Sequence, residues 1–364
     1  MICRLIAVAM LAALPVPVQA EEPAARRDAT VARAVAYLRA AQSEDGSYSS
    51  FAGPAITALV ATGLMDNGLT PVDPTVARTL TYLEGFVQED GGVYGPDSMY
   101  RNYETCVAVQ CLDRAAKSPN APRDYADTLA GAEVFLKGLQ WDEAEGHDPT
   151  STSYGGAGYG KHRRPDLSNT AFLVEALHAL GRGPEDPAIQ RALLFVSRTQ
   201  NLESEHNTTP FSVKVGDGGF YYTPAAGGSS QAGETETGGL RSYGSMTYAG
   251  LKSMIYAGVG PDDPRVQAAR TWIARHYTLE ENPQMGSAGY YYYLHTFAKA
   301  LAAVGDETFA DAEGVQHRWR AELIAKLAEL QTPAGSWINP NERWLEADPN
   351  LSTAYALLAL AQCQ

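Results

Sequence analysis

The residues best suited to chemistry in this 364-residue chain stand just before a series of apolar stretches. They combine hydroxyl, amide, carboxyl and aromatic side chains with one histidine, and they fall at residues 101–104, 166–169, 241–246, 290–295 and 348–352. Histidine exchanges protons near neutral pH, and tyrosine offers both a hydroxyl donor and a polarised ring face. His295 is therefore the candidate general acid or base, and Tyr243 is the second candidate catalytic group.

Further residues in these segments are candidate ligand contacts. Tyrosine rings can line an apolar cavity, stabilise a cation or stack on a sugar, or they can simply pack loops together. Asp166 and Asn169 have a second interpretation, because such residues are preferred caps at the start of a helix. The candidate contacts are Arg241, Ser245, Tyr248, Tyr292, Asp166, Asn169 and Glu104.

A short motif recurs along the chain and marks the elements that must position these residues. Glutamine is followed by glycine and an aromatic residue at residues 42–48, 88–94 and 331–337, and longer versions begin at Gln140 and Gln200. Self-similarity at a spacing of tens of residues indicates one supersecondary unit that is stacked several times.

Each copy of the motif lies between two helical patterns of different character. Val31, Val35 and Leu38 recur at helical spacing and predict an amphipathic helix, whereas residues 55–61 are apolar on nearly every side. The sequence therefore predicts six hairpins, each with a half-exposed outer helix and a buried inner helix. The other inner helices are predicted near 105–112, 170–180, 247–257, 296–304 and 353–360, and the other outer helices near 75–86, 126–139, 188–199, 265–277 and 319–330.

Two concentric helical rings satisfy both patterns, with the buried helices inside. An open solenoid is the alternative, but it needs polar capping units at both ends. The last predicted inner helix is as apolar as the middle ones, so closure avoids exposing it. We therefore expect an all-α fold, an α/α toroid of six hairpins with inner and outer rings, formed as a single domain by residues 21–364.

The motif resembles the repeat of squalene and oxidosqualene cyclases and of protein prenyltransferase β subunits. Residues 33–48 carry the family's basic residue, aromatic–aliphatic pair, glutamine and glycine-x-aromatic ending, and Phe135 with Gln140 and Phe195 with Gln200 keep its spacing. The fifth unit departs, since Tyr277 stands where glutamine is expected. The resemblance covers nearly all of the chain after residue 20. It implies an α/α toroid in which these repeat residues are structural.

The resemblance also shows which chemistry is missing. His295 matches a zinc-binding histidine of the prenyltransferases, but residues 241–248 lack the aspartate and cysteine that complete that site. The Asp-x-Asp-Asp run that cyclases use to protonate an alkene is absent, as is the diphosphate-binding Asp-Asp-x-x-Asp run. We therefore expect neither a conventional squalene cyclase nor a zinc prenyltransferase, and we expect no metal and no cofactor.

Three functional classes stay open. The leading hypothesis is a cavity that binds or transforms an apolar ligand such as an isoprenoid, with Tyr292 and Arg241 positioning it. A non-catalytic binding module of the same fold is the first alternative. A polysaccharide lyase or hydrolase is the second, because Glu104 and a facing carboxylate could act as an acid–base pair. Glu175 and His178 also share a helix face, being three residues apart.

The first 20 residues read as a signal peptide. Arg4 precedes a short apolar stretch, and Val18-Gln19-Ala20 supplies small residues before Glu21. We therefore expect export to the periplasm or outside the cell, with an uncleaved anchor as the alternative. No later stretch is apolar enough to span a membrane. The formal net charge of −14 argues against nucleic acid or an anionic membrane as a partner. An apolar small molecule or lipid is the partner that the leading hypothesis implies.

Overall fold

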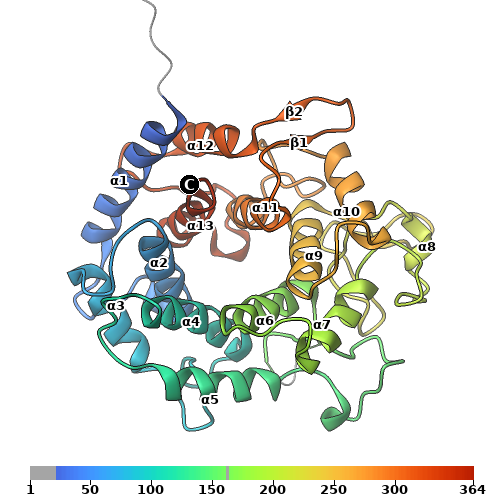
Figure 1. Cartoon of the computed structure of the whole chain (residues 1–364), viewed down its shortest axis with the longest axis horizontal. Helices are drawn as coiled ribbons and strands as arrows, with labels where there is room; N and C mark the ends of the chain where they lie inside the picture. The colour runs from blue at the N-terminus through green and yellow to red at the C-terminus, as the bar shows by residue number, and fades with distance from the viewer. Residues whose placement is uncertain (1–21, 161–163) are drawn as a thin grey trace, which may run out of the picture.

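Two concentric rings of helices make up the protein in the computed structural model, which describes residues 22–160 and 164–364 (Figure 1). The inner ring comprises α2 (Ala55–Asp66), α4 (Arg101–Ala116), α6 (Leu167–Ala179), α9 (Gly244–Tyr256), α11 (Tyr290–Val304) and α13 (Pro349–Ala361). The outer ring comprises α1 (Pro23–Ala41), α3 (Pro74–Glu84), α5 (Ala126–Lys137), α7 (Pro187–Arg198), α10 (Pro264–Arg275) and α12 (Trp319–Leu330). The predicted pairing of an outer with an inner helix is confirmed.

The remaining elements of the described residues are short. They are the 3₁₀ turns η1 (Ser50–Ala52), η2 (Glu143–Glu145) and η3 (Arg343–Leu345), the helix α8 (Ser212–Val215) and a hairpin of β1 (Phe309–Ala310) with β2 (Gln316–His317). Residues 202–239, which the sequence left open as a lid or a mobile loop, pass through α8, and this short helix lies outside α7 and α9 (Figure 1).

Aspartate followed by proline starts four of these helices and explains where they begin. The carboxylates of Asp73, Asp186 and Asp263 accept the backbone N–H two residues on, at 2.8–3.0 Å. Asp348 does the same at the start of α13. Proline fits the first helical position because its missing N–H would have no partner there.

The ring is closed, as the sequence predicted. Each inner helix packs against the next, and α13 packs against both α11 and α2. At this seam the Arg27 side chain donates to the Leu360 carbonyl at 2.9 Å, and the Asn67 amide donates to the Leu357 carbonyl at 2.9 Å. Gln331 in the last repeat donates to the carbonyl of Thr30 in α1 at 3.0 Å. The first and last hairpins therefore meet as ordinary neighbours, and no open end needs a cap.

The repeat glutamines connect successive hairpins through hydrogen bonds. Gln140 donates through Nε2 to the carbonyls of Gly155 and Ala188, both at 2.9 Å, and so ties its own loop to the first turn of α7. The glycine of the motif is required by space, because a Cβ on Gly335 would lie 2.5 Å from the Arg33 carbonyl. The aromatic residue binds back to its own outer helix, as when Trp337 donates to the Leu327 carbonyl at 2.9 Å. The repeat residues are thus structural.

Five inner helices begin earlier than the sequence predicted: α4, α6, α9 and α13 by three or four residues, and α11 by six. Helix α11 starts at Tyr290, so residues 290–295 belong to its first turns and not to the loop before them. The Glu346 carboxylate accepts the backbone N–H groups of Tyr291 and Tyr292 at 3.1 and 2.7 Å. This cap comes from a loop more than fifty residues away, which is why no local signal marks the start of the helix.

Two sequence predictions concern the chain termini and membranes. The predicted signal peptide, residues 1–20, lies outside the described residues. Within the described residues, no helix combines the length and the apolar composition that crossing a bilayer requires.

Cys106, Cys111 and Cys363 are free and buried.

Candidate functional site

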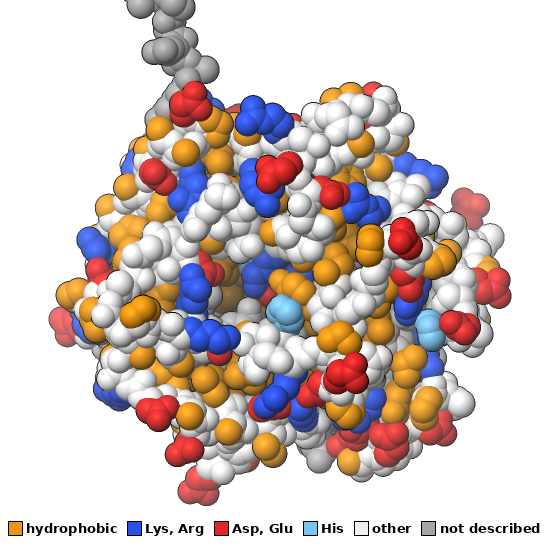
Figure 2. Space-filling model, viewed as in Figure 1, with side chains coloured by type: hydrophobic (Ala, Val, Ile, Leu, Met, Phe, Trp, Pro, Cys, Tyr) orange, Lys and Arg blue, Asp and Glu red, His pale blue; other side chains and the backbone are white. Residues whose placement is uncertain are grey.

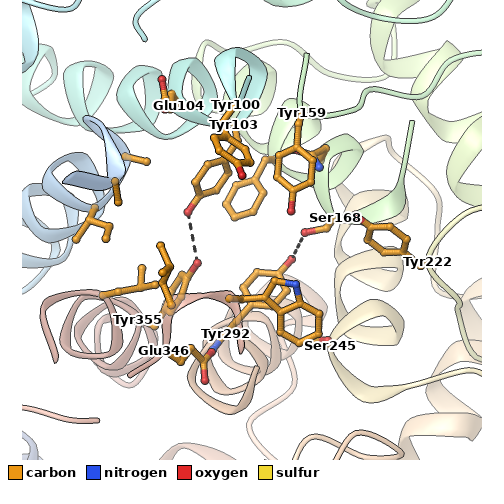
Figure 3. A pocket seen from close by; sticks show the side chains of 18 of the residues that line it. Tyr100, Tyr103, Glu104, Tyr159, Ser168, Tyr222, Ser245, Tyr292, Glu346 and Tyr355 are labelled. Carbon is orange, nitrogen blue, oxygen red and sulfur yellow. Dashed lines mark hydrogen bonds between the residues drawn. The ribbon is translucent and has the colours of Figure 1, made fainter. Parts of the chain in front are cut away.

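A cavity of about 440 Å³ opens at the N-terminal ends of the inner helices (Figure 3). Every inner helix contributes residues from its first two turns, and the loops before them complete the wall. Aromatic rings dominate the lining: Phe51, Tyr100, Tyr103, Tyr159, Phe172, Tyr222, Tyr243, Tyr292, Trp344 and Tyr355. Such a site suits an apolar ligand or one with a delocalised positive charge.

Two pairs of hydroxyl groups cross the cavity lining. The Tyr103 and Tyr355 hydroxyls lie 3.4 Å apart, and those of Ser168 and Tyr292 lie 3.0 Å apart. Burial raises the pKa of each tyrosine, so all three rings are neutral. The pairs join α4 to α13 and α6 to α11, and they restrain the orientation of the tyrosine rings in the lining.

Part of the cavity wall has an unusual backbone. Trp344 and Leu345 in η3 both lie in the left-handed region, with φ of 56° and 64°. Non-glycine residues adopt this conformation rarely, and it persists where surrounding structure imposes it, often at ligand sites. Both side chains line the cavity although they are 43% and 48% exposed.

Two carboxyl groups line the cavity, and both are held by donors. Glu104 accepts the Gly95 N–H and the Ser98 hydroxyl, both at 2.8 Å. Glu346 caps α11 and accepts from the Asn339 amide at 2.7 Å. Burial raises the pKa of both carboxyls above the usual range, against these hydrogen bonds.

Asp166 and Asn169 form a third polar unit at the start of α6. One carboxylate oxygen of Asp166 accepts the Asn169 backbone N–H at 2.9 Å, and the other accepts its side-chain amide at 2.8 Å. Burial raises the pKa of Asp166 to about 6, although the bonds from Asn169 oppose the shift. The capping interpretation therefore describes Asp166, while Asn169 both joins the cap and lines the cavity.

The structure brings together five of the nine residues that the sequence singled out. Those that line the cavity are Glu104, Asn169, Tyr243, Ser245 and Tyr292. Asp166 lies directly behind Asn169. The remaining three, Arg241, Tyr248 and His295, lie outside the cavity lining.

Arg241 and Tyr248 occupy opposite surroundings. Arg241 is exposed and donates to the Glu234 carbonyl at 3.1 Å on the surface. Tyr248 is buried, and its ring packs edge-on against Tyr293 and at a tilt against Phe297, with ring centroids 5.7 and 5.1 Å apart. Neither contact involves the cavity, so their predicted ligand roles have no geometric support from this arrangement.

His295 lies one layer behind the cavity. Its ring stacks on that of Tyr355, with centroids 5.5 Å apart, and its Nδ1 has no hydrogen-bond partner among the described residues. Burial, followed by the nearby Lys299 ammonium, lowers the pKa of His295 well below its usual value. The imidazole is therefore neutral, and Tyr355 separates it from the cavity. Its catalytic role stays a prediction.

Beyond His295 the lumen holds a buried ion cluster of Glu175, Lys252, Lys299 and Gln110. The Glu175 carboxylate pairs with both ammonium groups, and Lys299 also donates to the Gln110 side chain at 3.2 Å. Side-chain exposure is 5% for Glu175, 1% for Lys252 and 16% for Lys299. Burial would raise the pKa of Glu175, but the two lysines hold it well below its usual range.

Glu175 and His178 share a face of α6, but the ion-pair partners of Glu175 are the two lysines. His178 instead stacks on Tyr256, with ring centroids 4.1 Å apart. The face of the molecule seen in Figure 2 carries both signs of charge, and basic side chains and a histidine border the hollow at its centre.

Sequence reasoning missed several residues of the cavity and the cluster. Phe172 and Tyr355 follow their segment residues at helical spacing, so continuing each stripe by one turn would have found them. Lys252 is the lone charge in an otherwise uncharged inner helix, which is itself a signal that it has a buried partner. Trp344 and Glu346 reach the site through the fold and carry no local signal.

Metal ligation is not suggested by the side chains that the structure describes. Within residues 22–160 and 164–364, no three His, Cys, Asp or Glu side chains gather as a metal site would require.

Comparison with known proteins gives similarity of structure only. No family model and no curated protein sequence matches the chain. A single-residue variant of the type II terpene cyclase MstE from Scytonema superposes with a TM-score of 0.56 at 14% identity, covering 93% of this chain and 96% of that one. Another MstE variant, in complex with its substrate geranylgeranyl dihydroxybenzoate, gives 0.54 at 15% identity over 93% and 97%. A glycosyl hydrolase family 88 protein from Bacteroides vulgatus gives 0.53 at 11% identity over 92% and 98%.

The fold is an α/α toroid. Matches over nearly the whole of each chain establish this, and the predicted fold class is confirmed. At such low identity they carry no information about the reaction, and the same fold serves both a terpene cyclase and a glycosyl hydrolase. Function must therefore be argued from the cavity itself.

Proposed function

We propose that this is an exported α/α toroid protein that binds an apolar ligand, such as an isoprenoid, in the cavity at the N-terminal ends of its inner helices. The observation that carries the proposal is the lining of ten aromatic side chains, against two carboxyl groups and no lysine, arginine or histidine among its described residues. A large apolar cavity with few polar groups binds ligands mainly through burial of their hydrocarbon surface.

The structural likeness is consistent with this proposal. The MstE variant that holds geranylgeranyl dihydroxybenzoate shares the fold over nearly the full length of both chains. We do not extend its reaction to this protein, because the Asp-x-Asp-Asp run of conventional cyclases is absent. If the ligand is transformed, Tyr243 is the predicted catalytic group that lines the cavity. It is a neutral donor, since burial raises its pKa well above the usual value.

His295 enters the proposal as a positioning residue. It stacks behind Tyr355, whose hydroxyl faces that of Tyr103 across the lining. We expect His295→Ala to abolish retention or turnover of the ligand, because the Tyr355 ring loses its support. His276→Ala is the matched control, since that ring stacks on Trp272 in the outer helix α10. Unchanged retention in His295→Ala would remove this residue from the site.

The direct test is to find what the cavity holds. The chain lacking residues 1–20 is purified from its native host, extracted with organic solvent and examined by mass spectrometry. A stoichiometric isoprenoid or other lipid supports the proposal. A clean extract, together with failure of a series of isoprenoids to bind in equilibrium dialysis, would overturn it.

A polysaccharide-active enzyme remains the second candidate because Glu104 and Glu346 both line the cavity and have raised pKa values. Paired carboxyls can act as acid and base on a glycosidic bond. Glu346, however, accepts N–H groups at the start of α11, which is a capping role. Release of oligosaccharides from a panel of uronic-acid polysaccharides, lost in Glu104→Gln, would favour this candidate over the first.

A further inference from the structure

One hydroxyl group in the cavity lining has no partner among the described residues. Tyr243 comes directly before α9, is 2% exposed and lines the cavity, and its hydroxyl makes no hydrogen bond within residues 22–160 and 164–364. The hydroxyl of Tyr248 on α9 also lacks a partner, but its oxygen exposes less than 1 Å² and is sealed in the core. The Tyr243 oxygen is not sealed in this way, so a molecule in the cavity can reach it. An unpaired polar group inside a protein is costly, and this position therefore calls for a partner from the cavity.

The free position is that of a hydrogen-bond donor. Burial raises the pKa of Tyr243 well above its usual value, so the phenol keeps its proton. The carboxyls of the lining are already occupied by donors: Glu104 accepts a backbone N–H and a hydroxyl, and Glu346 accepts two backbone N–H groups and an amide. A carbonyl oxygen would accept the Tyr243 hydrogen, whereas an alcohol would also bring a donor of its own into this lining.

Positive charge near Tyr243 is engaged outside the cavity. Arg343 is the cation that acts on the Tyr243 hydroxyl, but it is exposed, lies over the Trp344 ring and donates to Gln231. It does not line the cavity, whereas two carboxyl groups do. The described interior therefore disfavours an anionic head group such as a carboxylate or a diphosphate.

The wall opposite Tyr243 is purely apolar. Helices α2 and α9 stand opposite each other in the inner ring, since two inner helices separate them on either side (Figure 1). The wall at α2 and the turn before it is formed by Phe51, Ala52, Ala55 and Ile56, whose side chains carry no polar atom. A ligand with its polar end at Tyr243 can therefore bury hydrocarbon against this wall.

We infer that the ligand is an apolar molecule with an uncharged carbonyl group, an isoprenoid or long-chain ketone or aldehyde, whose oxygen accepts a hydrogen bond from Tyr243 while its hydrocarbon part lies toward Ile56. This inference rests on the proposed function and adds the head group and its direction. It distinguishes the site from one for plain hydrocarbons, for alcohols, or for fatty acids and prenyl diphosphates with their anionic heads.

The first test compares ligands that share one hydrocarbon chain. Dissociation constants are measured by equilibrium dialysis for farnesylacetone, for its analogue with a methylene group in place of the carbonyl oxygen, for the alcohol formed by reducing the ketone, and for farnesylacetic acid. The ketone should bind more tightly than the alcohol and the carboxylate. Tighter binding of either one would overturn the inference.

A variant places the selectivity for the carbonyl on Tyr243. The dissociation constant of the methylene analogue divided by that of the ketone should fall about fivefold in Tyr243→Phe, because one neutral hydrogen bond is lost. A misfolded fraction cancels from this ratio, and the different hydration of the two ligands cancels between proteins. Tyr248→Phe is the matched control, since it removes the sealed hydroxyl of the same helix and should keep the ratio. An unchanged ratio in Tyr243→Phe, or an equal fall in both variants, would overturn the inference.

The bound carbonyl also reports the hydrogen bond directly. In isotope-edited infrared spectra of bound farnesylacetone, the C=O stretching band should lie at lower wavenumber in the unmodified protein and in Tyr248→Phe than in Tyr243→Phe, because accepting a hydrogen bond weakens the C=O bond. If neither the ketone nor the methylene analogue binds to the unmodified protein, the proposed function fails. If both bind and Tyr243→Phe changes neither the ratio nor the band, only the head-group inference fails.

Discussion

The cavity and the ion cluster lie inside the same ring of helices. The aromatic side chains of the cavity surround an open space, whereas the charged side chains of the cluster contact one another. Helix α11 serves both, with Tyr292 at the cavity, His295 behind it and Lys299 in the cluster. Helix α6 does the same with Phe172 and Glu175. These residues recur at three- or four-residue spacing, so each helix presents one stripe to the lumen.

The difference lies in what each layer of the stripe can do. Aromatic rings tied by hydroxyl pairs keep their positions and leave a hollow between them. Lysine and glutamate side chains are long and oppositely charged, so they reach across the lumen and pair there. The cavity should therefore govern binding and the cluster should govern stability.

The largest effect is expected from breaking the cluster. Glu175→Gln leaves two ammonium groups without their carboxylate partner in a buried site, which should lower the free energy of unfolding by about 3–5 kcal/mol. Urea denaturation followed by circular dichroism measures it. Ligand affinity of the folded fraction should stay unchanged, because Glu175 does not line the cavity.

A compensating variant shows whether charge is the cause. Replacing Glu175 with leucine and both Lys252 and Lys299 with methionine removes all three charges and should recover most of the lost stability. A loss below about 1 kcal/mol for Glu175→Gln would contradict the assignment of this layer to stability.

The next effect depends on pH and probes the cap beside the cavity. The pKa of Asp166 is raised by burial to about 6, so the folded state holds this proton more tightly than the unfolded state does. Its ionisation therefore costs stability as the pH rises from about 4 to above 6, by about 3 kcal/mol in all. The stability of the unmodified protein relative to Asp166→Asn should fall by that amount between pH 4 and 7, measured by denaturation at each pH.

Asp263 provides a control of opposite sign. It caps α10, and its hydrogen bonds from Arg265 lower its pKa. Its contribution is therefore present at neutral pH and lost as the pH falls. Relative to Asp263→Asn, the unmodified protein should gain stability as the pH rises. If the difference in unfolding free energy from the unmodified protein changed with pH in the same direction for both variants, burial beside the cavity would not destabilise the ionised carboxyl of Asp166.

The smallest effect is expected from a hydroxyl in the cavity lining. The Tyr103 and Tyr355 hydroxyls are 3.4 Å apart, a long hydrogen bond, so Tyr103→Phe should cost only about 0.5–1 kcal/mol in unfolding free energy. The same change alters the lining and should shift ligand affinity measurably in dialysis. A large loss of stability with no change in ligand affinity would show that the cavity lining governs stability and not binding.

The repeat architecture could be predicted because each unit carries its own local signals. Gln331 donates to the carbonyl of Gly335 four residues away, and Gly335 packs against the backbone of α1, so the spacing of the motif in the sequence reveals both residues. Ring closure also followed from the apolar last helix. The fold thus rests on short-range rules that are repeated.

The site was only partly predictable because its members meet across the ring. Glu175 pairs with Lys252, which is 77 residues away in the sequence. Glu346 accepts the backbone N–H groups of Tyr291 and Tyr292, which lie 55 and 54 residues before it. No spacing rule links such positions. Residues near the start of the inner helices, such as Tyr243 and Tyr292, could be found because that position alone places them at the cavity mouth.

The seam between the first and last hairpins has a consequence for how the protein is made. The gap between α11 and α2 is filled by the 13 residues of α13, which are translated after every other helix of the two rings. Until then the growing polypeptide has an unmatched apolar edge on both sides of that gap and no enclosed lumen. Ring closure and formation of the cavity therefore both require α13. A frameshift or a protease that removes this helix eliminates both.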